Sequence, residues 1–286
     1  MFALTAAISK DSGRHWSHLH PPPQHLVAAV PYPYDGSHLW FGWGDTAGIL
    51  QSPRDGYYYT IAHNRATINL QVNGSCLMRT KDLYDVKSWR GWNGSEFSVS
   101  FSNPYEPATG DTFQHVCQVL EGGEQGLPRG QHSHPMVVQG LVWSSFLRKH
   151  IAVLWNTGHD PTVCGGAPFL FALSDDLLTW SEAAALPMPP GLPNGTKSGQ
   201  YPIQVHQFTP VFGLYISTCD IMVLLLGAGS LAYPSLLDPS STSRNFDVVG
   251  QTPSLYFGLA NPAGTSLRNH WDALVRVPLD FGNWVN

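Results

Sequence analysis

The feature that most constrains the fold is a short signature that occurs three times along the chain. In each copy a Ser or Thr is followed after one residue by Asp, then by a brief turn, and then by a Trp. The copies occupy residues 9–16, 80–89 and 174–180, and a β-like run precedes each of them. A strand, a polar turn and a second strand that begins at an aromatic residue are typical of a β-hairpin. The signature therefore predicts a chain built from repeated hairpins.

The residue types of the signature suit structural work. The Asp carboxylate and the Ser or Thr hydroxyl can accept hydrogen bonds from backbone N–H groups, which holds a tight turn. The Trp indole supplies a large apolar surface that packs between sheets. We therefore expect Asp11, Asp82, Asp176 and their Trp partners to be fold residues rather than catalytic groups.

The strands around the second and third copies repeat as well. Before each copy come a short apolar run and then a longer aromatic or apolar run. These runs occupy residues 48–51, 57–62, 140–143 and 150–155. Each unit then consists of four strands in roughly 45 residues, the length of a propeller blade. A last unit ends in a strand at 274–279, whereas residues 187–231 fit no repeat.

The composition agrees with an all-β chain. Charged residues make up only 12%, whereas the chain has 28 Gly, 23 Pro, 10 Trp, 11 Tyr and 13 Phe. Gly and Pro favour turns and aromatic residues favour strands, so a helix bundle and a coiled coil are excluded. We expect one all-β domain over residues 1–286. It is a β-propeller of five blades, each a four-stranded antiparallel sheet, with a truncated first blade and an irregular stretch at 187–231.

Net charge and hydropathy limit the classes of partner that this chain can bind. The formal net charge of −5 provides no positive field for gripping phosphate backbones, so we expect no nucleic-acid partner. The longest apolar stretch, near 212–233, is interrupted by Asp220 and is shorter than the ~20 apolar residues that span a membrane. We therefore expect a buried strand there, no membrane partner, and a monomeric protein.

Two stretches resemble known propeller families. Residues 9–16 match the S-x-D-x-G-x-x-W Asp box of sialidase-like propellers. The "DGYYY" sequence at 55–59 and the "SDDLLTW" sequence at 174–180 resemble the blades of five-bladed glycoside hydrolases of the arabinanase, β-xylosidase and fructosidase type. The resemblance covers roughly residues 1–186 and 233–286. It implies a propeller with a carbohydrate ligand at the axial funnel and, where the protein is active, hydrolysis of a glycosidic bond.

The resemblance also implies three carboxylates on the innermost strands: a base, an Asp that tunes a pKa, and an acidic Glu. Glycosidic cleavage needs one protonated and one ionised carboxyl group flanking the scissile bond. We expect the strand that would carry the base to lie before the first residue, and the inner runs at 48–53 and 135–144 contain no acid. The candidate catalytic carboxylates are Asp45, Glu121 and Glu124.

Each of these carboxylates has a structural alternative as a loop or cap group, and the same holds for Asp220 and Asp238. The missing inner-strand acids favour a second hypothesis, a non-catalytic propeller that binds glycans or proteins. A third hypothesis is a structural remnant with open sheet edges. The sialidase comparison lacks a matching arginine motif, and we expect Tyr233 and Tyr256 to be core or rim aromatics.

Aromatic and histidine side chains provide candidates for substrate binding. Sugars stack their apolar faces on aromatic rings, although packing between blades consumes aromatic residues as well. The candidate substrate-binding residues are Trp40, Trp43, Trp92, Trp143, His132 and His134. The pairs at 18–20 and 132–134 place two imidazoles on one face of an extended chain, and with His25 or His115 they could hold a metal. A surface role without metal is the alternative, and we expect no cofactor beyond a structural cation that the propeller axis could hold.

The cysteines and the sequons leave the compartment open. Cys76, Cys117, Cys164 and Cys219 show no CxxC spacing, so a zinc ribbon is unsupported, and both free thiols and disulfides fit. N-x-S/T sequons occur at Asn73, Asn93 and Asn194, and each is also an Asn-Gly turn pair. We expect no signal peptide within the first residues, because they lack a basic start and a long apolar run, and only these sequons favour secretion.

Overall fold

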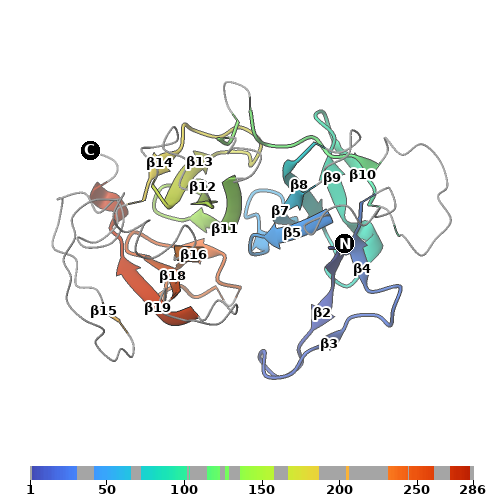
Figure 1. Cartoon of the computed structure of the whole chain (residues 1–286), viewed down its shortest axis with the longest axis horizontal. Coiled ribbons are helices and arrows are strands. Elements are labelled where there is room, and N and C mark those ends of the chain that lie inside the picture. Colours follow the sequence, from blue (N-terminus) through green and yellow to red (C-terminus); the bar gives the residue numbers. More distant parts are fainter. Residues whose placement is uncertain are drawn as a thin grey trace. The chain divides into compact units, whose positions relative to one another are not determined.

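The computed structural model consists of β-strands joined by turns (Figure 1). It describes residues 2–30, 42–65, 72–101, 103, 115–122, 126–128, 136–157, 167–186, 204–205, 231–243, 245–260 and 271–283. Within these residues no α-helix forms, and the two short 3₁₀ turns are η1 (Val86–Ser88) and η4 (Phe281–Asn283). The chain divides into two compact units, Met1–Glu121 and Gly122–Asn286. The predicted fold class, an all-β chain of antiparallel sheets, is confirmed.

The main sheet of the first unit is an antiparallel meander. Its strands are β5 (Gly42–Thr46), β6 (Leu50–Gln51), β7 (Tyr58–Arg65), β8 (Gly74–Thr80), β9 (Arg90–Trp92) and β10 (Phe97–Val99). The order across the sheet is β10-β9-β8-β7-β5, and β6 also pairs with β7. Strand β5 is the first strand of this sheet along the chain, and β6, within the run predicted at 48–51, pairs with the same neighbour, so the sheet has six strands rather than the four expected of a blade. We call this first strand of a sheet its leading strand.

Strand β7 is buried on both faces, and its buried residues include the polar Thr60, His63 and Asn64 as well as apolar side chains. One face joins a core formed by Ala28, Val30, Trp43, Ala62, Cys76, Met78, Trp89, Cys117 and Val119. A disulfide links Cys76 in β8 to Cys117, 41 residues later, with a Cα–Cα distance of 6.1 Å. Two small hairpin-like sheets precede this core. They pair β1 (Leu4–Thr5) with β4 (Leu26–Ala28) and β2 (Ala7–Ile8) with β3 (Ser17–His18).

The second unit contains two sheets with the same meander order. The first has β11 (Met136–Ser144), β12 (Lys149–Asn156), β13 (Phe169–Ser174) and β14 (Ala184–Ala185), and β17 (Val248–Val249) runs parallel to the end of β11. The second has β16 (Leu231–Leu237), β18 (Ser254–Ala260) and β19 (Trp271–Pro278). Their leading strands are β11 and β16.

The outer position of the last sheet is filled from the stretch that fitted no repeat. Strand β15 (Gln204–Val205) pairs antiparallel with β19, with Gln204 opposite Arg276. The stretch 187–231, which we expected to be irregular, therefore contains the short strand β15. The apolar residues 212–230 and Asp220 lie outside the described residues.

The core of the second unit lies between its two sheets. Phe169 of β13 and Phe257 of β18 are fully buried, and their ring centroids are 5.0 Å apart. They belong to a cluster that includes Ile151, Val153 and Phe281. Each fully buried side chain of this size contributes roughly 1.5–3 kcal/mol through the hydrophobic effect. The two sheets are thus held by apolar packing.

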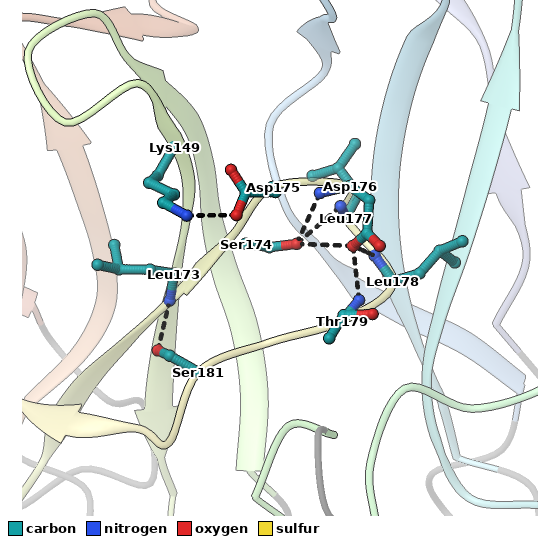
Figure 2. A network of polar contacts seen from close by, with 9 residues as sticks. All are labelled: Lys149, Leu173, Ser174, Asp175, Asp176, Leu177, Leu178, Thr179 and Ser181. Carbon is teal, nitrogen blue, oxygen red and sulfur yellow. Dashed lines mark hydrogen bonds and ion pairs between the residues drawn. The ribbon is translucent and has the colours of Figure 1, made fainter.

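The Asp–Trp turn at 174–180 shows how the repeated signature works (Figure 2). The Leu177 N–H donates to Ser174 Oγ at 2.8 Å, and the N–H groups of Leu178 and Thr179 donate to Asp176 Oδ1 at 2.9 and 2.7 Å. The indole N–H of Trp180 donates to the Leu177 carbonyl at 3.1 Å. Burial acts to raise the pKa of Asp176, but these backbone hydrogen bonds outweigh it and hold the pKa below its usual value.

The turn at 9–16 repeats this pattern. The Gly13 N–H donates to Ser9 Oγ at 2.8 Å, and the His15 N–H donates to Asp11 Oδ1 at 2.9 Å. The indole N–H of Trp16 donates to the Gly13 carbonyl at 3.0 Å. In the longer turn at 80–89 the Tyr84 N–H donates to Asp82 at 2.8 Å. The prediction that these Asp residues are fold residues agrees with all three turns.

Candidate functional site

The leading strands β5, β11 and β16 share an irregularity near their first residues. In β5 the pairing with β7 passes from Gly44 directly to Thr46. In β11 the pairing with β12 passes from Val138 to Gly140, and in β16 the pairing with β18 passes from Ala232 to Ser235. Each leading strand therefore carries a β-bulge at the same place in its sheet. The bulges contain Asp45, Gln139 and Tyr233.

Two of the three bulge residues, Gln139 and Tyr233, are more accessible than their neighbours in the chain. Gln139 lies between the buried residues Val138 and Gly140, and Tyr233 is 53% exposed between buried Ala232 and Pro234. Asp45 and Tyr233 have φ angles of +45° and +58°, which a residue other than Gly rarely adopts. Bulges turn a side chain away from the regular alternation of a strand and occur often beside active sites. The repeated bulge is therefore the first candidate for function.

In the first unit, the bulge residue Asp45 forms an ion pair with Arg65 at the end of β7. Both side chains are partly exposed, at 20% and 26%. His63 lies beside them, 2% exposed, and its Nδ1 is 3.4 Å from Ser75 Oγ. Burial and then the Arg65 charge lower the pKa of His63 to about 4, although Asp45 and the Asn73 amide act in the opposite direction. The His63 imidazole is therefore neutral near pH 7. The charges of Asp45 and Arg65 both act on it.

Glu121, a candidate catalytic carboxylate, is buried and bound to the backbone. The Ser75 N–H at the start of β8 donates to both carboxylate oxygens, at 2.7 and 2.8 Å. The contact requires a residue without a side chain at position 74, because a Cβ on Gly74 would lie 2.6 Å from Glu121 Oε2. The Glu121 carboxylate thus binds the backbone at the start of β8. Glu124 lies outside the described residues.

The predicted tryptophans divide between core and surface. Trp43 is 2% exposed and packs edge-on against Phe101, with ring centroids 5.4 Å apart. Its expected exposure is wrong, because Trp43 lies on the face of β5 that joins the core, and the packing alternative holds. Trp92 and Trp143 are half-buried. The ring centroid of Trp92 lies 5.1 Å from that of Phe97, and the ring centroid of Trp143 lies 4.8 Å from that of His150. Trp40, His132 and His134 lie outside the described residues.

In the second unit, the bulge residue Tyr233 meets Trp155 of β12. Their ring centroids are 5.5 Å apart and their planes are inclined by 49°. Trp155 is half-buried and packs against the core of this unit. Sequence reasoning treated Tyr233 as a core or rim aromatic and did not single out Trp155. The only signal for Tyr233 was its place before a Pro in a short apolar run, which does not indicate a bulge.

A second polar network of the first unit lies at the other end of β7. The Tyr59 hydroxyl donates to Asp55 at 2.7 Å and accepts from Arg79 at 3.2 Å. The Arg79 guanidinium stands 4.1 Å from the ring centroids of both Tyr57 and Phe97. Burial raises the pKa of Tyr59 to about 12, with Asp55 adding to the rise and Arg79 opposing it. The "DGYYY" sequence thus contributes to a cation–π stack that fixes the sheet.

Two further expectations concern acids and sequons. Asp238 accepts from the N–H groups of Ser240 and Gly250 at 2.8 and 2.7 Å. It therefore caps a loop, which is the structural role given above as the alternative to catalysis. Asn93 accepts from the Ser95 N–H at 2.8 Å, as a turn residue does. Asn194 lies outside the described residues.

No metal centre is formed by the side chains that the structure describes. Within those residues no group of three His, Cys, Asp or Glu side chains comes together. The rings of His18 and His25 meet edge-on with their centroids 4.7 Å apart. His20 Nε2 instead lies 2.9 Å from the Tyr84 carbonyl oxygen. None of the described helices has the length and apolar character needed to cross a membrane.

No family model matches the sequence, and no curated protein matches it. Among solved structures, the chain is similar to the catalytic domain of the Coprinopsis cinerea GH62 alpha-L-arabinofuranosidase, with a TM-score of 0.41, 10% identity, and coverage of 90% of this chain and 53% of that chain. A GH62 hydrolase in complex with xylotriose gives a TM-score of 0.40 at 9% identity, covering 89% and 52%. The chain therefore spans about half the length of these two structures.

A third similar structure is an N-acetylgalactosamine deacetylase from F. plautii in complex with blood group B trisaccharide. Its TM-score is 0.36 at 14% identity, covering 96% of this chain and 80% of that chain. At these TM-scores no site or activity transfers to this chain. The candidate site depends on the geometry of the bulges alone.

Proposed function

We propose that this protein binds carbohydrate through the bulged ends of its leading strands, as a non-hydrolytic member of the glycoside-hydrolase-like propellers. The observation that carries the proposal is the repeated bulge, at which Asp45, Gln139 and Tyr233 present polar or aromatic side chains that are at least partly exposed. Sugar recognition needs both kinds of group, because hydroxyls require charged or amide partners and the ring faces require apolar surface.

In the first unit, Asp45 and Arg65 supply the polar half of such recognition. A carboxylate accepts hydrogen bonds from sugar hydroxyls, and a guanidinium donates to their oxygens. Because the two charges already neutralise each other, the pair suits a ligand that is polar and uncharged. The partial exposure of both side chains leaves them accessible to such a ligand.

Binding is favoured over hydrolysis by the state of the candidate acids. Hydrolysis requires two carboxyl groups, one of them protonated. Asp45 is already engaged in an ion pair with Arg65, and both oxygens of Glu121 accept from the Ser75 backbone N–H. Neither described candidate is therefore arranged as a general acid. We propose that the sheets form a five-bladed propeller and that the protein acts as a monomer.

The test is a glycan array with the full chain, followed by titration calorimetry on the ligand found. The D45N variant should weaken binding by about tenfold, the loss expected for one hydrogen bond to a charged group. The E182Q variant, which changes an exposed acid far along the chain, should bind like the wild type. Binding to no glycan on the array would refute the proposal.

A parallel assay with aryl glycosides separates binding from catalysis. We expect no turnover from the wild-type protein. Turnover that E121Q or E124Q abolishes would reject the non-hydrolytic proposal in favour of a glycosidase.

A further inference from the structure

We propose that Asn93 carries an N-linked glycan, and that Asn73 carries none, when the chain folds in an oxidising secretory compartment. Both residues begin an Asn-x-Ser sequon, the sequence that oligosaccharide transfer to asparagine requires. The sequence alone could not choose between them, because each is also an Asn-Gly turn pair. This inference concerns modification of the chain itself and does not depend on the proposed carbohydrate binding.

The sequon at 93–95 lies on the surface of the first unit. It occupies the turn between β9 and β10, and residues 93–96 are all exposed. Strand β10 is the outermost described strand of its sheet, so the turn lies at the margin of the sheet. An exposed turn at this position can bear a bulky, hydrated glycan without displacing core side chains.

The Asn93 side chain can keep its turn contacts when a sugar is attached. Its Oδ1 accepts from the N–H groups of Ser95 and Glu96, each at 2.8 Å, and its Nδ2 donates to Ser98 Oγ at 2.8 Å. A side-chain amide nitrogen has two hydrogens, and attachment of a sugar replaces only one of them. The carbonyl oxygen and one N–H therefore remain for the turn.

The sequon at 73–75 is enclosed instead. Asn73 Oδ1 is buried, and the Asn73 amide lies beside the imidazole of His63, which is 2% exposed. Ser75 is fully buried, and Gly74 between the two sequon residues is buried as well. A glycan on Asn73 would therefore have to displace groups that are packed in the sheet.

The disulfide is an independent reason to place folding in an oxidising compartment. Cys76 and Cys117 are 0% and 4% exposed, and their bond links β8 to a segment 41 residues later. Disulfides form and persist in secreted proteins and in the lumen of the endoplasmic reticulum, whereas cytosolic thiols stay reduced. Sequons of secreted proteins receive their glycans on the same route. The bond and the glycan therefore require the same compartment.

The modification is a group transfer from an oligosaccharide linked to a lipid diphosphate, catalysed by the cell's oligosaccharide transferase. The Asn93 amide nitrogen forms a bond to the anomeric carbon of the sugar. The bond from that carbon to the diphosphate oxygen breaks, and the diphosphate leaves with the electron pair while the amide nitrogen loses one proton. The transfer consumes no oxidant and no reductant.

The test secretes the full chain from a eukaryotic cell line behind a cleavable leader, with N194Q to remove the third sequon. An amidase that releases N-linked glycans leaves Asp in place of each glycosylated Asn, and peptide mass spectrometry then locates the sites. We expect conversion at Asn93 in most of the soluble protein and none at Asn73. Cys76 should be linked to Cys117 in the same material.

Two variants of Ser95 separate glycosylation from folding. S95A keeps the backbone contacts of Asn93 but destroys the sequon, so it should lose this glycan and still be secreted with the cross-link. S95T keeps the sequon and should keep the glycan. The matched control is S98A, which removes a hydrogen-bond partner of the Asn93 amide but leaves the sequon intact, so it should stay glycosylated.

Three results would overturn the inference. The first is an unmodified Asn93 in the secreted protein, and the second is a glycan at Asn73 in soluble, folded protein. The third is free thiols at Cys76 and Cys117 in glycosylated material that unfolds cooperatively. None of these results bears on ligand binding, which the glycan array tests separately.

Discussion

The Asp–Trp turns at 9–16 and 174–180 form the same hydrogen bonds in opposite surroundings. In both turns a Ser hydroxyl and an Asp carboxylate accept from backbone N–H groups, and the indole N–H closes the loop on a carbonyl. Trp16 is nevertheless 66% exposed, whereas Trp180 is 3% exposed. The local sequence therefore suffices for the turn, and the surrounding strands decide how much the turn stabilises the fold.

The largest expected difference between the two turns concerns their indoles. W180A should lower the free energy of unfolding by about 3–5 kcal/mol, because it leaves a cavity in a packed region. W16A should change it by no more than about 0.5 kcal/mol, because the ring faces solvent. Urea unfolding of the full chain measures both values. Equal losses would show that the indole acts mainly within its own turn.

A smaller difference is expected in the pH dependence of the two carboxylates. The pKa of Asp176 is lowered in the folded protein, so its contribution to stability is present above the unfolded value near 3.8 and is lost as the pH falls through the folded value. D176N should therefore cost about 1 kcal/mol at pH 7 and progressively less below pH 4. The pKa of Asp11 is lowered too, by hydrogen bonds from the His15 backbone and side chain.

The control for this prediction is D11N, measured over the same pH range. Because Asp11 lies in an exposed turn, water screens its interactions and D11N should have the smaller effect. A D176N variant whose cost does not change between pH 7 and pH 3 would contradict the assignment.

The smallest expected effect concerns an ion pair beside the buried turn. Lys149 of β12 pairs with Asp175 in Figure 2, and their side chains are 40% and 58% exposed. K149M should cost at most about 0.5 kcal/mol, because exposed ion pairs are solvated and screened by salt. Unfolding in low and high salt measures it. If K149M lowered the free energy of unfolding more than D176N does, the ion pair rather than the capped turn would be the main support of the turn at 174–180.

The sequence predicted those parts of the fold that depend on neighbouring residues. The three Asp–Trp turns and the strands before them follow from hydroxyl, acidic and aromatic residues at fixed short spacing. The aromatic run at 57–62 likewise predicted the strand β7. Residues 9–16 needed no information from the rest of the chain to form their hydrogen bonds.

The candidate site could be predicted only in part. Asp45 was found, but its bulge depends on the register with β7, which no local pattern encodes. The same reason hid Tyr233, because a bulge moved an apparently buried ring to the surface. Trp43 failed in the opposite direction, since its cross-strand partner Asn64 places it on the core face. The outer strand β15 joins residues far apart in sequence, so the repeat could not reveal it.

The bond between Cys76 and Cys117 affects how the protein should be produced. It joins the middle of a buried strand to a segment 41 residues away, so it restricts the unfolded chain and favours the native pairing. Thiols stay reduced in the bacterial cytosol. Material expressed there without an oxidising step would lack this cross-link, and a poor yield of folded protein would then reflect the host rather than the sequence.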